Sequence, residues 1–179
     1  MALCEKILIT GFSGSGKTTL MKELKRSAPA KWLYLEDLDD LVLKNHGKNQ
    51  YQTLADLIEK EGWENFRLWE RQELEIFLKT EGFGVISLGG GTLNPALIQM
   101  YSITPKLLMC HLDADFKTCW TRLELDTGEP RPLVSMGKVA FERLYRERQN
   151  LFRSIPWRLQ NSEGNEISEV ASSFWKTVS

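Results

Sequence analysis

The chain has 179 residues, of which 42% are hydrophobic and 26% charged, and its formal net charge at pH 7 is −1. These values are typical of one water-soluble globular domain with a substantial core. A balanced charge offers no basic surface for nucleic acid, and no apolar run approaches the roughly 18 residues of a membrane span. Cys4, Cys110 and Cys119 are scattered without metal-ligand spacing, which indicates reduced thiols. We expect a cytoplasmic protein without a nucleic-acid or membrane partner.

Residues 11–18 read GFSGSGKT and match the phosphate-binding pattern G-x-x-x-x-G-K-[ST]. A strand-like apolar run over 6–10 precedes the motif, and apolar residues recur at helical spacing after it. Glycines let backbone N–H groups surround a phosphate chain, and the next helix adds its positive end. Lys17 is expected to reach the terminal phosphates and the Thr18 hydroxyl to hold Mg²⁺. The predicted nucleotide contacts are Gly11, Ser13, Gly14, Ser15, Gly16, Lys17, Thr18 and Thr19.

Strands and helices alternate along the rest of the chain. We expect further strands over 32–35, 83–88 and 107–112 and near 157–159, with helices over about 39–46, 53–61, 63–79, 94–103, 113–125, 138–152 and from about 167. Most of these strands are continuous apolar runs, which is typical of a parallel sheet covered on both faces. The sequence therefore predicts a single α/β domain over residues 1–179, a three-layer α/β/α structure around a central five-stranded parallel sheet.

Polar or small residues follow two of these strands. Asp37, Asp39 and Asp40 follow the second strand, at a carboxyl end where α/β sheets bind ligands, although Asp39 and Asp40 could instead cap the next helix. Three glycines at 89–91 follow the third strand, where a motor ATPase would carry acidic residues. The sequence also lacks the guanine-reading Asn/Thr-Lys-x-Asp segment of a GTPase. The pattern therefore favours a small-molecule kinase.

Two arginines stand out on predicted helices. Arg148 follows Leu144 and Tyr145 by four and three residues and so shares their apolar face, where an unpaired guanidinium group is costly. Arg67 could form a surface ion pair with Glu70 on its own helix, or it could bind an anion.

In chain order, these motifs resemble the shikimate kinase family over about residues 7 to 153. The segments that carry the resemblance are the phosphate loop, Asp37-Leu38-Asp39, Phe66-Arg67-Leu68-Trp69-Glu70, Leu88-Gly89-Gly90-Gly91, Arg131-Pro132-Leu133 and Arg148. The resemblance implies a P-loop kinase fold, ATP and Mg²⁺ as cofactors, and phosphorylation of the 3-hydroxyl of shikimate in aromatic amino-acid biosynthesis. It also implies a substrate-binding helical region at about 39–80 and a lid at about 122–137.

The resemblance further implies individual roles. Asp39 would accept hydrogen bonds from the substrate hydroxyls, while Asp37 would be linked to the metal or act as a base. Arg131 in the lid would contact the transferring phosphate, and Arg122 would pack on the adenine, unless it lies on a solvated helix face. The implied substrate-binding residues are Asp39, Arg67, Gly89, Gly90, Gly91 and Arg148, and the implied catalytic residues are Lys17, Asp37 and Arg131.

Some features depart from the family pattern. Trp63 stands where a family glutamate commonly follows Gly62, and Leu43 stands where the acidic block after the second strand often ends in glutamate. We expect both positions to lie outside the chemistry and the protein to act as a monomer. Two other functions stay open: a P-loop kinase for another small hydroxy acid such as gluconate, and a non-catalytic ATP-binding regulator.

Overall fold

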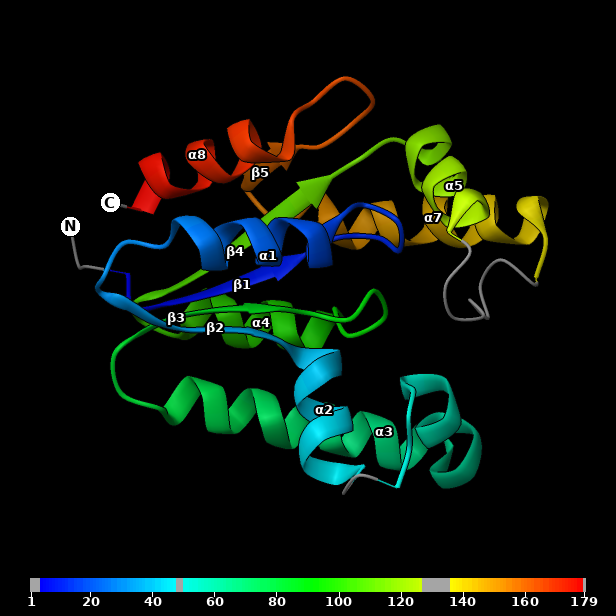
Figure 1. The fold of residues 1–179 in the computed structure, drawn as a ribbon, viewed down its shortest axis with the longest axis horizontal. Helices are drawn as coiled ribbons and strands as arrows, with labels where there is room; N and C mark the ends of the chain where they lie inside the picture. Colours follow the sequence, from blue (N-terminus) through cyan, green and yellow to red (C-terminus); the bar gives the residue numbers. More distant parts are fainter. Residues whose placement is uncertain (1–3, 48–49, 127–135, 179) are drawn as a thin grey trace.

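A parallel sheet forms the centre of the molecule. The computed structural model describes residues 4–47, 50–126 and 136–178. Its strands are β1 (Lys6–Thr10), β2 (Trp32–Asp37), β3 (Phe83–Ser87), β4 (Leu107–Asp113) and β5 (Trp157–Gln160), in the order β2-β3-β1-β4-β5 (Figure 1). All four strand pairs are parallel. The predicted five-stranded parallel sheet is confirmed.

Helices cover both faces of this sheet (Figure 1). On one face, α1 (Lys17–Ser27) and α8 (Ile167–Val178) share a core cluster with the sheet. On the other face, α4 (Pro95–Ile103), α5 (Phe116–Leu125) and α7 (Lys138–Phe152) contribute to a second cluster. This arrangement is the predicted three-layer architecture.

The strand residues alternate between the two clusters. Ile7, Ile9 and Val85 pack toward α1 and α8, whereas Leu8 and Ile86 pack toward the opposite face. Successive side chains of a strand point to opposite faces, so a sheet covered on both sides needs apolar residues at every position. This requirement explains the continuous apolar runs in the sequence.

A helical region projects from the sheet between β2 and β3. It comprises α2 (Leu38–His46) and α3 (Leu54–Lys79), and it has a small core of its own around Val42, Leu57 and Phe66. The two predicted helical runs are joined in α3 across Gly62, whose φ of 83° and ψ of 160° interrupt the helix. Glycine adopts this positive φ without steric strain, and the resulting kink aims the first part of α3 differently from the second.

Helix caps agree with the sequence in two places and differ in one. Thr53 and Asn94 stand at the predicted starts of α3 and α4 and cap these helices, accepting hydrogen bonds from the backbone N–H groups of Asp56 and Leu97. At α2, however, the cap is Asp37, which accepts from the Asp39 N–H, and not Asp39 or Asp40. The helix begins one residue earlier than predicted, at Leu38, because β2 leads directly into it. Within the described ranges, no helix combines the length and apolarity needed to span a bilayer.

Candidate functional site

The phosphate loop connects β1 to α1 at the carboxyl edge of the sheet. Gly14 and Gly16 have φ values of 82° and 93°, which favour glycine and let the backbone turn around an anion. Gly16 also occupies the N-cap position of α1, and in this part of the structure no side chain caps the helix. Backbone N–H groups and the positive helix end therefore stay available to a phosphate.

Lys17 lies across the phosphate loop. Its ammonium group donates to the carbonyl oxygens of Gly11 and Phe12, at 2.8 and 3.1 Å. Burial raises the pKa values of Asp37 and Asp39, and the positive charge of Lys17 partly opposes this rise. Lys17 thus lies between the phosphate loop and the two acids after β2. Thr18 and Thr19 are exposed on the first turn of α1.

Asp37 is buried and Asp39 is half-buried, and the pKa values of both carboxyl groups are raised. Burial and the nearby charge of Asp40 raise the pKa of Asp37. For Asp39, burial acts first and the charges of Asp37 and Glu70 add to it, raising the pKa to about 7. Within the described residues, the Asp39 Oδ1 atom has no hydrogen-bond partner. The Oδ1 atom can therefore accept a hydrogen bond from a ligand in the cavity that Asp39 lines.

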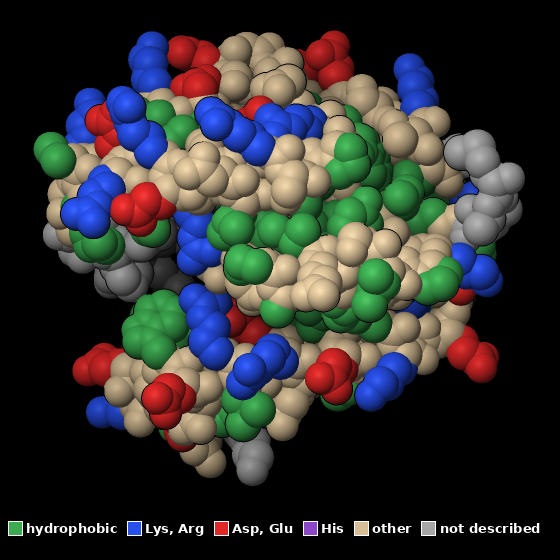
Figure 2. All heavy atoms as spheres, turned by 180° about the vertical axis from the view of Figure 1, so that it is seen from behind, with side chains coloured by type: hydrophobic (Ala, Val, Ile, Leu, Met, Phe, Trp, Pro, Cys, Tyr) green, Lys and Arg blue, Asp and Glu red, His purple; other side chains and the backbone are tan. Residues whose placement is uncertain are grey.

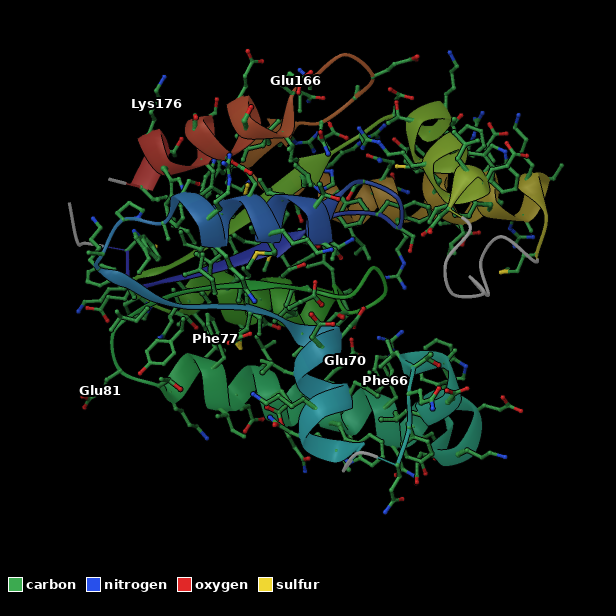
Figure 3. The ribbon with its side chains drawn as sticks, in the orientation of Figure 1. Phe66, Glu70, Phe77, Glu81, Glu166 and Lys176 are labelled. Carbon is green, nitrogen blue, oxygen red and sulfur yellow. The ribbon has the colours of Figure 1, made fainter. Side chains whose placement is uncertain are left out.

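Arg67 forms the predicted ion pair with Glu70, but the pair does not lie on the surface. The side chain of Glu70 is only 2% exposed, and it also accepts a hydrogen bond from the Thr92 hydroxyl. Phe66 and Glu70 leave α3 on the side that faces the body of the molecule (Figure 3). The carboxylate therefore fixes Arg67 at the border of a pocket while leaving part of the guanidinium group accessible.

Arg148 approaches the same place from α7. It donates to the Leu93 carbonyl oxygen at 2.8 Å. Burial and the positive charge of Arg67 lower its pKa. A Cβ atom placed on Gly91 would lie 2.6 Å from one Arg67 nitrogen and 3.6 Å from one Arg148 nitrogen. Two guanidinium groups that converge on one turn form a site suited to a carboxylate or another anion.

A cavity of about 280 Å³ connects these groups. Charged side chains border a hollow between the helical region and the body of the molecule in Figure 2. The first part of α3 supplies apolar side chains, Leu54, Ala55 and Ile58, to its lining. The cavity is lined by Phe12, Ser13, Asp39, Leu54, Ala55, Ile58, Trp63, Phe66, Arg67, Glu70, Gly89, Gly90, Gly91, Leu123, Leu144 and Arg148.

The structure thus brings together the predicted acceptor residues, Asp39, Arg67, residues 89–91 and Arg148, next to the phosphate loop. Arg122, expected on a nucleotide base, donates to the Ser15 carbonyl oxygen at 3.3 Å and approaches that of Gly14 at 3.5 Å. Arg131 and most of the predicted lid lie outside the described residues. Leu43 packs in the small core of the helical region, away from the cavity.

Trp63, which was expected to lie outside the chemistry, borders the cavity. Trp63 lines the cavity, and its ring stacks on the Arg67 guanidinium group, whose central carbon is 5.3 Å from the ring centroid. The side chain stays 54% exposed, so it borders the opening. The i, i+4 spacing of Trp63 and Arg67 places the two side chains on one helix face, which accounts for this contact.

Sequence reasoning also left Thr92 and Asn161 unassigned. Thr92 joins Glu70 to the turn after β3, and Asn161 is a buried residue beyond β5 whose amide donates to the Ser15 carbonyl oxygen at 2.6 Å. Both residues follow a parallel strand at the same sheet edge as Asp37. This position after a strand is the one feature of the sequence that could have indicated them.

The residues present fit a magnesium-bound nucleotide. The uncapped α1 end and the positive-φ glycines suit phosphate oxygens, and Thr18 and Asp37 could supply hard oxygen ligands. Within the described part of the chain, no group of three or more His, Cys, Asp or Glu side chains could hold a metal alone. An ion at this position would thus depend on phosphate oxygens for much of its coordination, as is usual for Mg²⁺.

A phosphate loop on a five-stranded parallel sheet, facing a separate helical region with an anion-binding pocket, defines a P-loop kinase. The family model for shikimate kinase matches residues 13–179, and the chain belongs to the shikimate kinase family. It is 32% identical over 166 residues to the shikimate kinase of Sulfurihydrogenibium sp., covering 93% of each chain.

Solved structures have the same fold. The chain resembles shikimate kinase from Bacteroides thetaiotaomicron with a TM-score of 0.77 and 20% identity, covering 97% of this chain and 98% of that one. It also resembles shikimate kinase from Acinetobacter baumannii in complex with shikimate, with a TM-score of 0.74, 20% identity and coverage of 97% and 92%.

The raised pKa of Asp39 predicts a stability cost that depends on pH. Because the folded-state pKa is about 7 and the ordinary value is 3.8, the ionised carboxylate destabilises the fold as pH rises between these values. Asp39→Asn should therefore raise the free energy of unfolding of the ligand-free protein by about 2 kcal/mol at pH 8, and by little near pH 4. Urea titrations at both pH values measure the difference.

Glu59→Gln provides the control, because Glu59 is an exposed acid on α3 and its replacement should change the free energy of unfolding little. If Asp39→Asn is no more stable than the wild-type protein at pH 8, the ionised Asp39 carboxylate does not destabilise the fold as predicted.

Proposed function

We propose that this shikimate kinase family member transfers the γ-phosphoryl group of ATP to the 3-hydroxyl of shikimate, giving shikimate 3-phosphate and ADP. The observation that carries the proposal is the convergence of Arg67 and Arg148 on Gly91, across from Asp39 and beside the phosphate loop. Shikimate is a small ring with one carboxylate and three hydroxyls. Its carboxylate suits the two arginines, while its hydroxyls suit Asp39 as an acceptor.

The phosphate loop would hold the ATP phosphates through its backbone N–H groups and Lys17. Thr18 and Asp37 would hold Mg²⁺, which neutralises phosphate charge when bound. Phosphoryl transfer depends mainly on positioning and on charge stabilisation, so the fixed distance between phosphate loop and acceptor pocket is the main contribution of this fold.

The hydroxyl proton can pass to a carboxylate beside the transferring oxygen. Burial and the nearby charges of Asp37 and Glu70 raise the pKa of Asp39 to about 7, which makes it a better proton acceptor than an ordinary surface aspartate, while Asp37 could take this role only when it does not bind the metal. Three assignments stay predictions: contact of Arg131 with the transferring phosphate, packing of Arg122 on the adenine, and a lid over residues 122–137. The monomeric state and the cytoplasmic location also stay predictions.

The direct test is a coupled ADP-release assay with Mg-ATP, adding shikimate, gluconate and nucleoside monophosphates one at a time. We expect shikimate alone to stimulate ADP release. Stimulation by gluconate would support kinase activity but would show that the acceptor is not shikimate. If ATP binds and no acceptor stimulates ADP release, the non-catalytic regulator becomes the better description.

Lys17→Met should remove transfer while the protein stays folded, because the ammonium group donates to loop carbonyl oxygens and is positioned to reach the expected phosphates. We expect kcat to fall by at least about a hundredfold, as when one charge-stabilising donor is lost from an active site. Lys22→Met, an exposed position on the same helix, is the control and should keep full activity. A fully active Lys17→Met protein would refute the role.

Arg67→Ala should weaken acceptor binding by about tenfold or more, because it removes one of two cations facing the carboxylate. It also leaves Glu70 buried without its ion-pair partner, so the free energy of unfolding should fall as well. Calorimetric titration with shikimate separates the two effects. The exposed Arg71→Ala on the same helix should change neither quantity. Unchanged shikimate affinity with reduced stability would make Arg67 purely structural.

A further inference from the structure

Two side chains donate hydrogen bonds to the carbonyl oxygen of the peptide between Ser15 and Gly16. The Asn161 amide donates to the Ser15 carbonyl oxygen at 2.6 Å, and an Arg122 nitrogen donates to the same oxygen at 3.3 Å. A Cβ atom on Gly16 would lie 2.5 Å from the Asn161 amide nitrogen. Gly16 is thus needed for this approach as well as for its positive φ.

These contacts decide where the peptide N–H points. In a trans peptide, the carbonyl and the N–H group lie on opposite sides of the bond, and the described chain contains no cis peptide. Because the Ser15 carbonyl points outward to Asn161, the Gly16 N–H points away from Asn161, toward the inside of the phosphate loop. A donor on the carbonyl also polarises the peptide, which makes the N–H a stronger donor to an anion.

Asn161 is itself rigidly placed. It follows β5 directly, its backbone N–H donates to the Asp113 carbonyl oxygen at 2.7 Å, and the residue is 3% exposed. A buried amide without a partner would cost free energy, so its side chain has a strong reason to keep the Ser15 contact. The Arg122 contact is longer, and Arg122 is only partly buried on α5. Asn161 is therefore the better defined of the two contacts.

We propose that Asn161 is a positioning residue for the nucleotide phosphates: its amide holds the Ser15 carbonyl outward and so keeps the Gly16 N–H directed into the phosphate loop. The proposal deepens the proposed function and rests on it, because it assumes that the loop binds nucleotide phosphates. It links the segment after β5 to the phosphate loop, although Asn161 and Ser15 lie 146 residues apart in sequence.

The test compares two ligands that share a base and ribose but differ in phosphates. With Asn161→Ala, the dissociation constant of ADP should rise about tenfold, the effect of losing one buried hydrogen bond, while that of adenosine stays unchanged. In steady-state kinetics, KM for ATP should rise and KM for shikimate should stay the same. Asn165→Ala, an exposed position in the same segment, is the matched control and should behave as wild type.

If Asn161→Ala does not fold, Asn161→Ser is used, because it keeps a polar side chain that is too short to reach Ser15. The dissociation constants of ADP and adenosine are then measured on that variant. Equal losses of ADP and adenosine affinity would assign Asn161 to the base side of the site and overturn the proposal. Unchanged ADP affinity would overturn it too. A wild-type protein that binds no ADP would refute both proposals, whereas one that binds ADP but does not phosphorylate shikimate would refute only the proposed function.

Discussion

The acceptor side of this structure depends on one buried carboxylate, Glu70. It pairs with Arg67 one turn earlier on α3 and accepts a hydrogen bond from Thr92 in the turn after β3. A buried charge is tolerated only when it is paired and hydrogen-bonded, and both conditions are met here. Through these two contacts, Glu70 joins the helical region to the sheet edge. It also places a cation beside the cavity and raises the pKa of Asp39.

The same concentration of charge is unfavourable for folding. The charges of Asp37 and Glu70 add to the effect of burial in raising the pKa of Asp39, and burial together with the charge of Arg67 lowers the pKa of Arg148. Such arrangements collect at functional sites, where a ligand later supplies the missing partners. The surrounding fold offsets the cost through two extended hydrophobic clusters, one on each face of the sheet. The site and the core therefore have opposite effects on stability, and they meet at the carboxyl ends of the strands.

The sequence predicted features that depend on nearby residues. Apolar runs predicted the strands, and Thr53 and Asn94 marked helix starts correctly. The burial of Arg148 followed from its spacing to apolar neighbours on one helix. The helical spacing of Arg67 and Glu70 offered their ion pair as one of two alternatives, but the sequence could not show that Glu70 is buried, because that depends on how α3 packs against the turn after β3.

Features that depend on distant residues were missed or misplaced. Three acids, Asp37, Asp39 and Asp40, lie near the start of α2 in sequence. Asp37 is the cap because β2 ends at this residue and α2 begins directly after it. Asn161 lacks any motif, and its contact with Ser15 exists because β5 lies at the edge of the sheet next to β4.

The three glycines after β3 are explained by three separate contacts. A Cβ atom on Gly89 would lie 2.7 Å from an Asp39 carboxylate oxygen, and one on Gly90 would lie 3.0 Å from the Ser13 hydroxyl of the phosphate loop. On Gly91 it would meet the Arg67 guanidinium group at 2.6 Å. Each glycine thus admits a different part of the site: the acid, the phosphate loop and the anion-binding arginine. Because reacting groups must approach to about 3–3.5 Å for transfer, side chains on this turn would push the donor and acceptor halves apart. The absence of side chains at 89–91 is therefore what allows the phosphate loop and the acceptor pocket to form one site.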